Sequence, residues 1–166
     1  MFRKSKYLPL FIMALALLLL PVESGAEQSS ENNIVLGPAV AQIFDNENVL
    51  YSMVEFRHYF RNSSTGMLTS LEVANDICYF ALGIFRDRKL ISNLYSGFSI
   101  SPGVISKKGE EELGYILEFR SSIELFYQGE NSHRLGLSIN HYSNSGLGKT
   151  NPGTESIRLM LSFPVY

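Results

Sequence analysis

The sequence has no tryptophan, a single cysteine and, beyond residue 20, no apolar run of the roughly 20 residues that a membrane helix needs. Cys78 alone cannot form an intrachain disulfide, and a structural zinc site requires several ligands. We expect it to be a small, inert apolar residue on a strand. These absences exclude a disulfide scaffold, a zinc-finger fold and a helical membrane bundle.

Positive charge is scarce after the first 26 residues. That segment has a basic start at positions 3, 4 and 6, an apolar core from Leu8 to Leu20 and small residues at 24–26, and we interpret it as a cleaved secretory signal peptide. An uncleaved amino-terminal anchor is the alternative. The remaining domain, 27–166, has 14 − 3 = 11 basic and 16 − 1 = 15 acidic residues. This net charge of −4 argues against nucleic acid as a partner.

What the chain has instead is a succession of alternating apolar and polar residues, rich in phenylalanine and tyrosine. Alternation with a period of two is typical of strands. We expect eight of them, at about 34–43, 47–61, 66–75, 77–86, 90–101, 113–127, 133–144 and 155–166. An exported all-β chain with this pattern is either a soluble sandwich or barrel, or an outer-membrane barrel.

The polar side of the strands distinguishes these two alternatives. In a soluble barrel the charges would face water, whereas in a membrane barrel they would pair inside. Strand length and charges of both signs favour an eight-stranded antiparallel up-and-down transmembrane barrel. Its predicted inner turns are 62–65, 87–89 and 129–132, and its longer outer loops are 102–112 and 145–154. We expect an interior network of Glu55, Arg57, Glu118, Arg120, Glu124 and Arg158 that leaves no channel.

Near the predicted outer loops, three chemically reactive residues occupy the same strand face as the apolar residues. His141 and Ser143 follow Ile139 on one strand face, and Glu155 precedes Ile157 on the next. If Ser143 pairs with Glu155, then Glu155 is a diagonal neighbour of His141. In a hydrolase triad, imidazole activates the serine and the carboxylate orients the imidazole. A band of polar residues at the headgroup level is the alternative.

Other candidates are weaker. Asn144 and the amides of the turn at Gly146 are candidate oxyanion donors. His58 is expected to lie at the membrane interface and His133 at the inner turn. Ionisable groups on a lipid-facing surface are costly, which favours a functional interpretation of His141 and Glu155. The mechanism needs no cofactor or metal, and no convincing metal ligand set is present.

The segments 134–146 and 151–156, with His141-Tyr142-Ser143-Asn144 and the spacing to Glu155, resemble the carboxy-terminal signature of the lipid A 3-O-deacylase family (PagL). Residues 119–125 fit the same resemblance, and Ser145 replaces the usual alanine. The resemblance is sharp over about 113–166 and only architectural before that. It implies an eight-stranded outer-membrane barrel with His141, Ser143 and Glu155 as the triad and Asn144 as an oxyanion contributor.

The resemblance further implies a carboxylic ester hydrolase whose substrate is lipid A of lipopolysaccharide. Two alternatives are kept: an outer-membrane phospholipid acyl hydrolase with the same triad, and a non-catalytic structural or ligand-binding barrel. A homodimer is left open.

Overall fold

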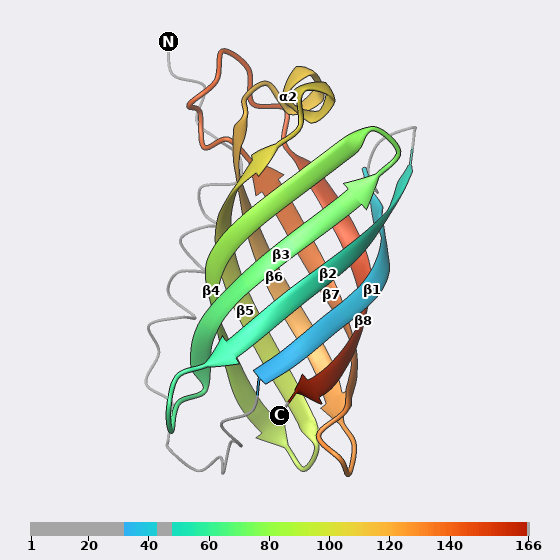
Figure 1. Cartoon of the computed structure of the whole chain (residues 1–166), viewed down its shortest axis with the longest axis vertical. Coiled ribbons are helices and arrows are strands. Elements are labelled where there is room, and N and C mark those ends of the chain that lie inside the picture. The colour runs from blue at the N-terminus through green and yellow to red at the C-terminus, as the bar shows by residue number, and fades with distance from the viewer. Residues whose placement is uncertain (1–31, 43–47, 166) are drawn as a thin grey trace.

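The computed structural model describes residues 32–42 and 48–165, which form one closed barrel (Figure 1). Each strand pairs antiparallel with the next, and β1 pairs with β8. The predicted fold class is therefore confirmed. The elements are β1 (Asn32–Ala41), β2 (Val49–Tyr59), β3 (Thr65–Ala74), β4 (Ile77–Ile91), β5 (Leu94–Ile105), α2 (Lys107–Leu113), β6 (Leu117–Gln128), β7 (Arg134–Ser143) and β8 (Thr154–Val165).

The alternation of the sequence becomes the two faces of the barrel wall. On β2, Leu50 and Val54 are 70% and 51% exposed, whereas Glu55 and Arg57 between the exposed positions are buried. The other strands repeat this inversion, with large apolar side chains outside and charged ones inside. A soluble barrel would bury the apolar set, so the surface is that of a transmembrane barrel.

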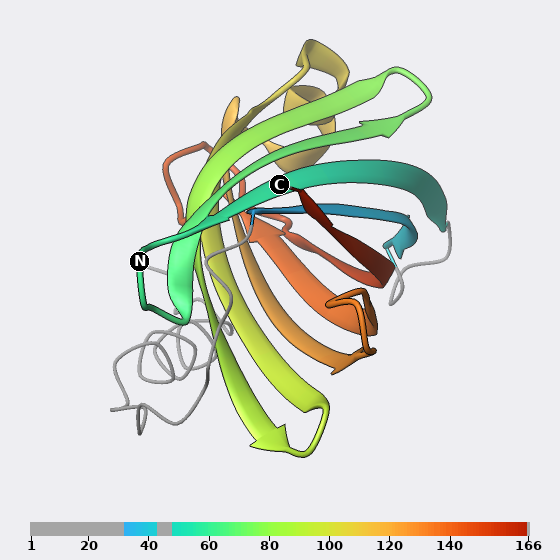
Figure 2. The same ribbon diagram turned by 60° about the horizontal axis from the view of Figure 1, so that its bottom comes forward.

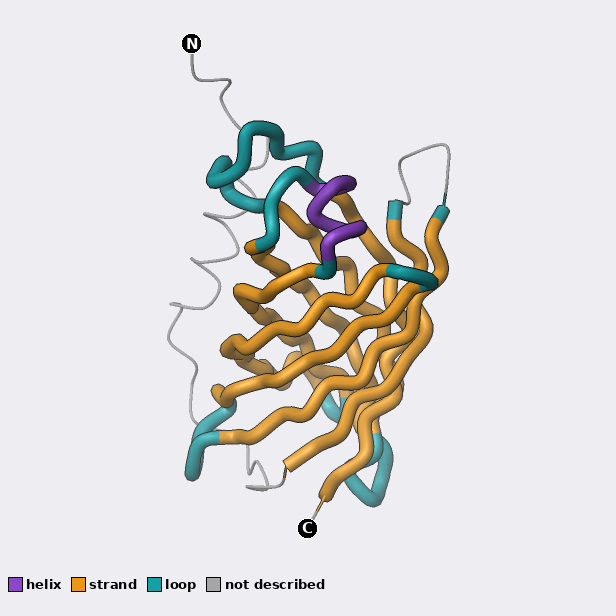
Figure 3. Tube along the Cα trace, turned by 45° about the horizontal axis from the view of Figure 1, so that its top comes forward, coloured by secondary structure: helices purple, strands orange, loops and turns teal. Residues whose placement is uncertain are grey.

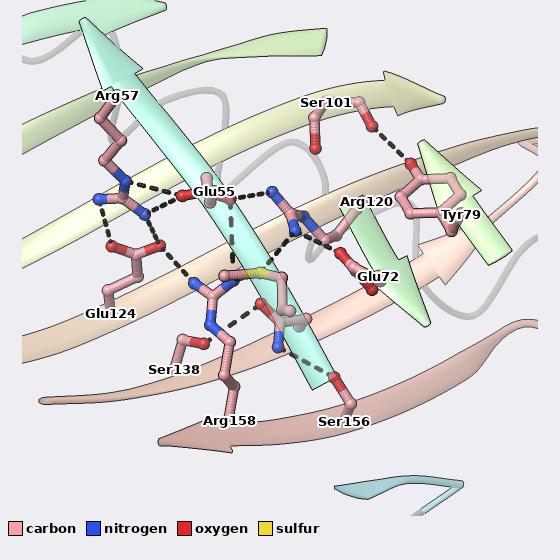
Figure 4. Close-up of polar contacts among 12 residues, drawn as sticks. Glu55, Arg57, Glu72, Tyr79, Ser101, Arg120, Glu124, Ser138, Ser156 and Arg158 are labelled. Atoms are coloured by element: carbon pink, nitrogen blue, oxygen red, sulfur yellow. Dashed lines mark hydrogen bonds and ion pairs between the residues drawn. The ribbon is translucent and has the colours of Figure 1, made fainter. Parts of the chain in front are cut away.

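The interior is filled by a network of ion pairs (Figure 4). Glu55 lies between two arginines, with one oxygen 2.6 Å from Arg57 and the other 2.6 Å from Arg120. Arg57 also contacts Glu124 at 2.7 Å, and Arg158 contacts the same carboxylate at 3.2 Å. These five strand-borne charges, three arginines and two glutamates, pair with one another and fill the barrel with bonded side chains.

Two glutamates change the predicted membership of this network. Glu72, which sequence reasoning did not include, forms an ion pair with Arg120 and accepts a hydrogen bond from the Tyr142 hydroxyl at 2.7 Å. Glu118 is buried as expected but takes part in none of the ion pairs found within 32–42 and 48–165. The prediction is thus right for five of six residues and wrong for Glu118.

The two ends of the barrel differ. Figure 2 looks toward the end where β1 begins and β8 finishes, which also carries the β2–β3, β4–β5 and β6–β7 turns. The opposite end carries α2 and the β7–β8 loop, which lie next to each other in Figure 3. Long connections after the fifth and seventh strands are confirmed, but the first lies at 106–116 instead of 102–112, because β5 continues to Ile105. Residues 1–26, the predicted signal peptide, lie outside the described residues.

Two further predicted boundaries are wrong. Residues 87–89 are not a turn but part of β4, which continues to Ile91 and turns at 92–93. Asp87 faces inward there and contacts Arg134 at 2.7 Å, so a polar residue that resembles a turn residue is an interior charge. Leu113 ends α2 instead of starting the sixth strand, because Gly114 follows with φ = 89° and terminates the helix.

Helix α2 covers the outer mouth of the barrel. Its Leu113 is buried with Ile105 and Tyr142. Gly109 packs directly against Ile105, because a Cβ at this position would stand only 2.4 Å from the Ile105 side chain. A cavity of about 80 Å³ remains beneath the helix. In the described part of the chain, no helix is long and apolar enough to cross a membrane. Helix α2 lies in the β5–β6 connection, and its Leu113 carbonyl accepts a hydrogen bond from Asn144 of the β7–β8 loop. The helix thus contacts the loop beside the candidate site.

Candidate active site

Strand β7 presents the predicted histidine and serine on the outward face. Outward and inward positions alternate along the strand, and Asn140 and Tyr142 are buried while Ile139 is 59% exposed. His141 and Ser143 follow Ile139 on the same parity and are partly exposed near the outer end. The strand period of two thus places both reactive groups on the lipid-facing surface.

Glu155 lies directly opposite His141, which corrects the predicted register. His141 pairs with Glu155 and Tyr142 with Thr154, so Ser143 is not opposite Glu155 as expected. Sequence parity could not detect this, because a slip of two residues leaves every side chain on its face. His141 Nδ1 and Glu155 Oε1 are 3.1 Å apart, and the side chains are only 13% and 22% exposed.

This contact is the geometry that a histidine-dependent esterase needs. A carboxylate at Nδ1 fixes the imidazole tautomer and leaves Nε2 to exchange a proton with a hydroxyl. Ser143 lies two residues farther out on the same face of β7, opposite Phe119 of β6. The three predicted residues therefore share one surface patch, in which His141 and Glu155 are in contact.

Asn144 lies on the interior side and anchors the outer loop. Its Nδ2 donates to the carbonyl oxygens of Leu113 at 3.0 Å and Thr150 at 2.8 Å, and its Oδ1 accepts from the Gly146 amide at 2.9 Å. Its own amide donates to Asn151 Oδ1 at 3.1 Å. An oxyanion role for Asn144 or Gly146 therefore requires at least one of these bonds to open when substrate binds.

Sequence reasoning missed two neighbours of His141. Gly153 has φ = 69°, and a Cβ there would stand 3.4 Å from His141 Cε1. Ser121 of β6 is the direct cross-strand partner of His141 on the side away from Glu155. The dipeptide Pro152-Gly153 predicts a turn, and this was the sequence signal that could have indicated the positive φ of Gly153. Ser121 has no such signal, since it depends on the pairing of β6 with β7.

The remaining candidates lie elsewhere. His58 points outward, with Nδ1 2.6 Å from Asn32 Oδ1. His133 stacks edge-on with Phe163, the ring centroids being 5.5 Å apart. Cys78 is exposed on β4. Among the described residues, no three His, Cys, Asp or Glu side chains lie close enough to hold a metal ion.

Fold and site together define a class: a transmembrane β-barrel with an ionisable site on its lipid-facing surface near the outer loops. The family model for lipid A 3-O-deacylase (PagL) matches residues 42–164. The chain belongs to this family, as its carboxy-terminal motif predicted. No curated protein matches the sequence significantly.

Two solved structures resemble the barrel. A crystal structure of the outer-membrane enzyme PagL superposes with a TM-score of 0.60 at 15% identity, covering 80% of this chain and 99% of that one. A de novo designed transmembrane β-barrel gives the same TM-score at 8% identity, covering 84% and 98%. At these identities the likeness concerns the fold alone.

Proposed function

We propose that this protein is a lipid A 3-O-deacylase, which hydrolyses the ester that links a 3-hydroxyacyl chain to position 3 of lipid A. The observation that carries the proposal is the contact between His141 and Glu155 on the lipid-facing surface. Ionisable groups that face lipid are costly, so their presence on this surface favours a functional role. Membership of the lipid A 3-O-deacylase family supports the same activity.

In the proposed mechanism Ser143 Oγ attacks the ester carbonyl while His141 Nε2 takes its proton. Glu155 holds Nδ1 and stabilises the imidazolium. The tetrahedral intermediate expels the sugar oxygen, which receives the proton from His141, and the acyl chain stays on Ser143. Water, deprotonated by His141, then releases the hydroxy fatty acid and restores the serine.

The negative oxygen of the tetrahedral intermediate needs nearby donors. Asn144 and the amide of Gly146 are proposed for this role, with the bonds of the loop opening as substrate enters. We place the enzyme in the bacterial outer membrane, after export and cleavage of residues 1–26. The outer position of the site supports lipopolysaccharide as substrate, because this lipid occupies the outer leaflet. A homodimer is a separate expectation, and cross-linking in the membrane that yields a band of twice the monomer mass would support it.

One expression experiment tests the activity. The chain and its Ser143→Ala variant are produced in a Gram-negative host, and lipid A and phospholipids are compared by mass spectrometry. Ser145→Ala is the matched control, since Ser145 is an exposed serine two residues away. We expect one hydroxyacyl chain to be lost from lipid A with wild type and Ser145→Ala, and none with Ser143→Ala.

Other outcomes identify the alternatives. Lysophospholipid beside intact lipid A would indicate a phospholipid acyl hydrolase. Unchanged lipids in cells that contain the folded barrel, recognised by its heat-modifiable gel mobility, would indicate a non-catalytic protein. Full activity of Ser143→Ala would exclude this serine as the nucleophile.

A further inference from the structure

Strands β6 and β7 form a ladder of side-chain pairs on the lipid-facing surface. The outermost row is Phe119 with Ser143, and the next row inward is Ser121 with His141. The three rows beyond are apolar: Ile123 with Ile139, Leu125 with Leu137 and Tyr127 with Leu135. The apolar members of these rows are strongly exposed. The ladder therefore runs from the candidate nucleophile toward the membrane centre, along the path open to an acyl chain.

Ser121 shares with His141 the first row of side chains below Ser143. Paired side chains on adjacent strands have Cβ atoms about 5 Å apart, and diagonal neighbours are also within reach of substrate bound between them. Ser121 is the direct neighbour of His141 and the diagonal neighbour of Ser143. Its side chain is partly exposed, whereas Arg120 and Ser122 on either side are buried in the interior.

We propose that Ser121 determines specificity by hydrogen-bonding the 3-hydroxyl group of the acyl chain whose ester Ser143 attacks. This inference rests on the proposed function. The carbonyl carbon must lie at Ser143, and the chain then descends past the Ser121–His141 row onto the apolar rows. The 3-hydroxyl is two carbons below the carbonyl, so it lies between the Ser143 row and the Ser121–His141 row, where it faces the Ser121 hydroxyl.

The chemistry of the two hydroxyls is complementary. A serine hydroxyl can both donate and accept, and so can the 3-hydroxyl of the chain. In an apolar environment either group is costly without a partner. A chain without the 3-hydroxyl leaves Ser121 unsatisfied, and sites that bond a substrate hydroxyl discriminate against analogues that lack it. Because Ser121 is at the surface, we expect a preference of about three- to tenfold, the effect of one net hydrogen bond.

The test is a competition between two lipid A substrates. They differ only in whether the position-3 acyl chain carries the 3-hydroxyl, and both are offered together in detergent micelles to the purified full-length mature protein. Mass spectrometry of the released acids gives the ratio of kcat/KM. Wild type should prefer the hydroxyacyl ester about three- to tenfold, Ser121→Ala should lose the preference, and Ser121→Thr should retain it.

Ser52→Ala is the matched control, because Ser52 is an exposed serine on β2, which does not pair with the strands of the site. It should keep the wild-type ratio. Folding of each variant is checked by heat-modifiable mobility. An unchanged ratio in folded Ser121→Ala, equal slowing of both substrates, or no preference in wild type would overturn the inference while leaving the deacylase proposal intact. Failure of wild type to cleave either substrate would overturn the proposed function and this inference with it.

Discussion

Replacing Glu155 by glutamine keeps the size of the side chain and removes its charge, which isolates its electrostatic effect on His141. The two side chains are 3.1 Å apart and mostly shielded from solvent. At an effective dielectric constant of about 20, two unit charges at this distance attract by about 5 kcal/mol. Partial exposure reduces this, so we take about 2.5 to 5 kcal/mol as the stabilisation lost when the imidazole becomes charged.

This loss applies to the transition state, in which His141 has taken the serine proton. At about 1.4 kcal/mol for each factor of ten, kcat should fall roughly 60- to 4,000-fold. KM should change little, because in the proposed mechanism the positive charge on the imidazole develops as the serine proton is transferred, after substrate has bound. The assay is the initial rate of hydroxy fatty acid release from lipid A in micelles. Glu111→Gln, an exposed glutamate on α2, is the control. A folded Glu155→Gln enzyme within threefold of the wild-type rate would refute the triad assignment.

Three further predictions concern the supports of the site. Glu55→Ala leaves Arg120 without one of its buried partners and should lower the free energy of unfolding by about 3–5 kcal/mol in urea titrations in lipid vesicles; a change below about 1 kcal/mol would contradict it. Asn144→Ala removes three side-chain hydrogen bonds, so limited proteolysis should cut the 145–153 loop faster while the barrel stays intact; equal cleavage rates would argue against this anchor. Gly153→Ala strains a positive-φ residue by about 1 kcal/mol and places a Cβ 3.4 Å from His141 Cε1, so a small shift of the loop should misalign the ring and lower lipid A deacylation at least about tenfold; full activity would contradict this.

Several features of the protein followed from local alternation. Because strand side chains point to opposite faces in turn, the apolar stripe of β2 and its charged positions predicted both the outer surface and the interior network. The same parity put His141, Ser143 and Glu155 on one face. These are properties of single strands, and they hold whichever residues lie opposite.

Tertiary pairing decided the rest. Asp87 resembles a turn residue in the sequence, but inside the barrel it forms an ion pair with Arg134 of β7. Residues 87–91 therefore belong to β4, which continues to Ile91. Leu113 fits the strand parity, yet it belongs to α2, whose packing over the barrel mouth depends on Ile105 and Tyr142. In both cases, contacts between residues far apart in the chain decided which local structure formed.

The sequence by itself therefore determined an eight-stranded transmembrane barrel with a lipid-facing His–Ser–Glu patch, because a period of two is encoded in each strand. It did not determine which members of the patch touch. A shift of two residues keeps all faces unchanged, so only the observed pairing of β7 with β8 brought Glu155 directly to His141. Likewise, only the pairing of β6 with β7 brought Ser121 to the other side of the same histidine.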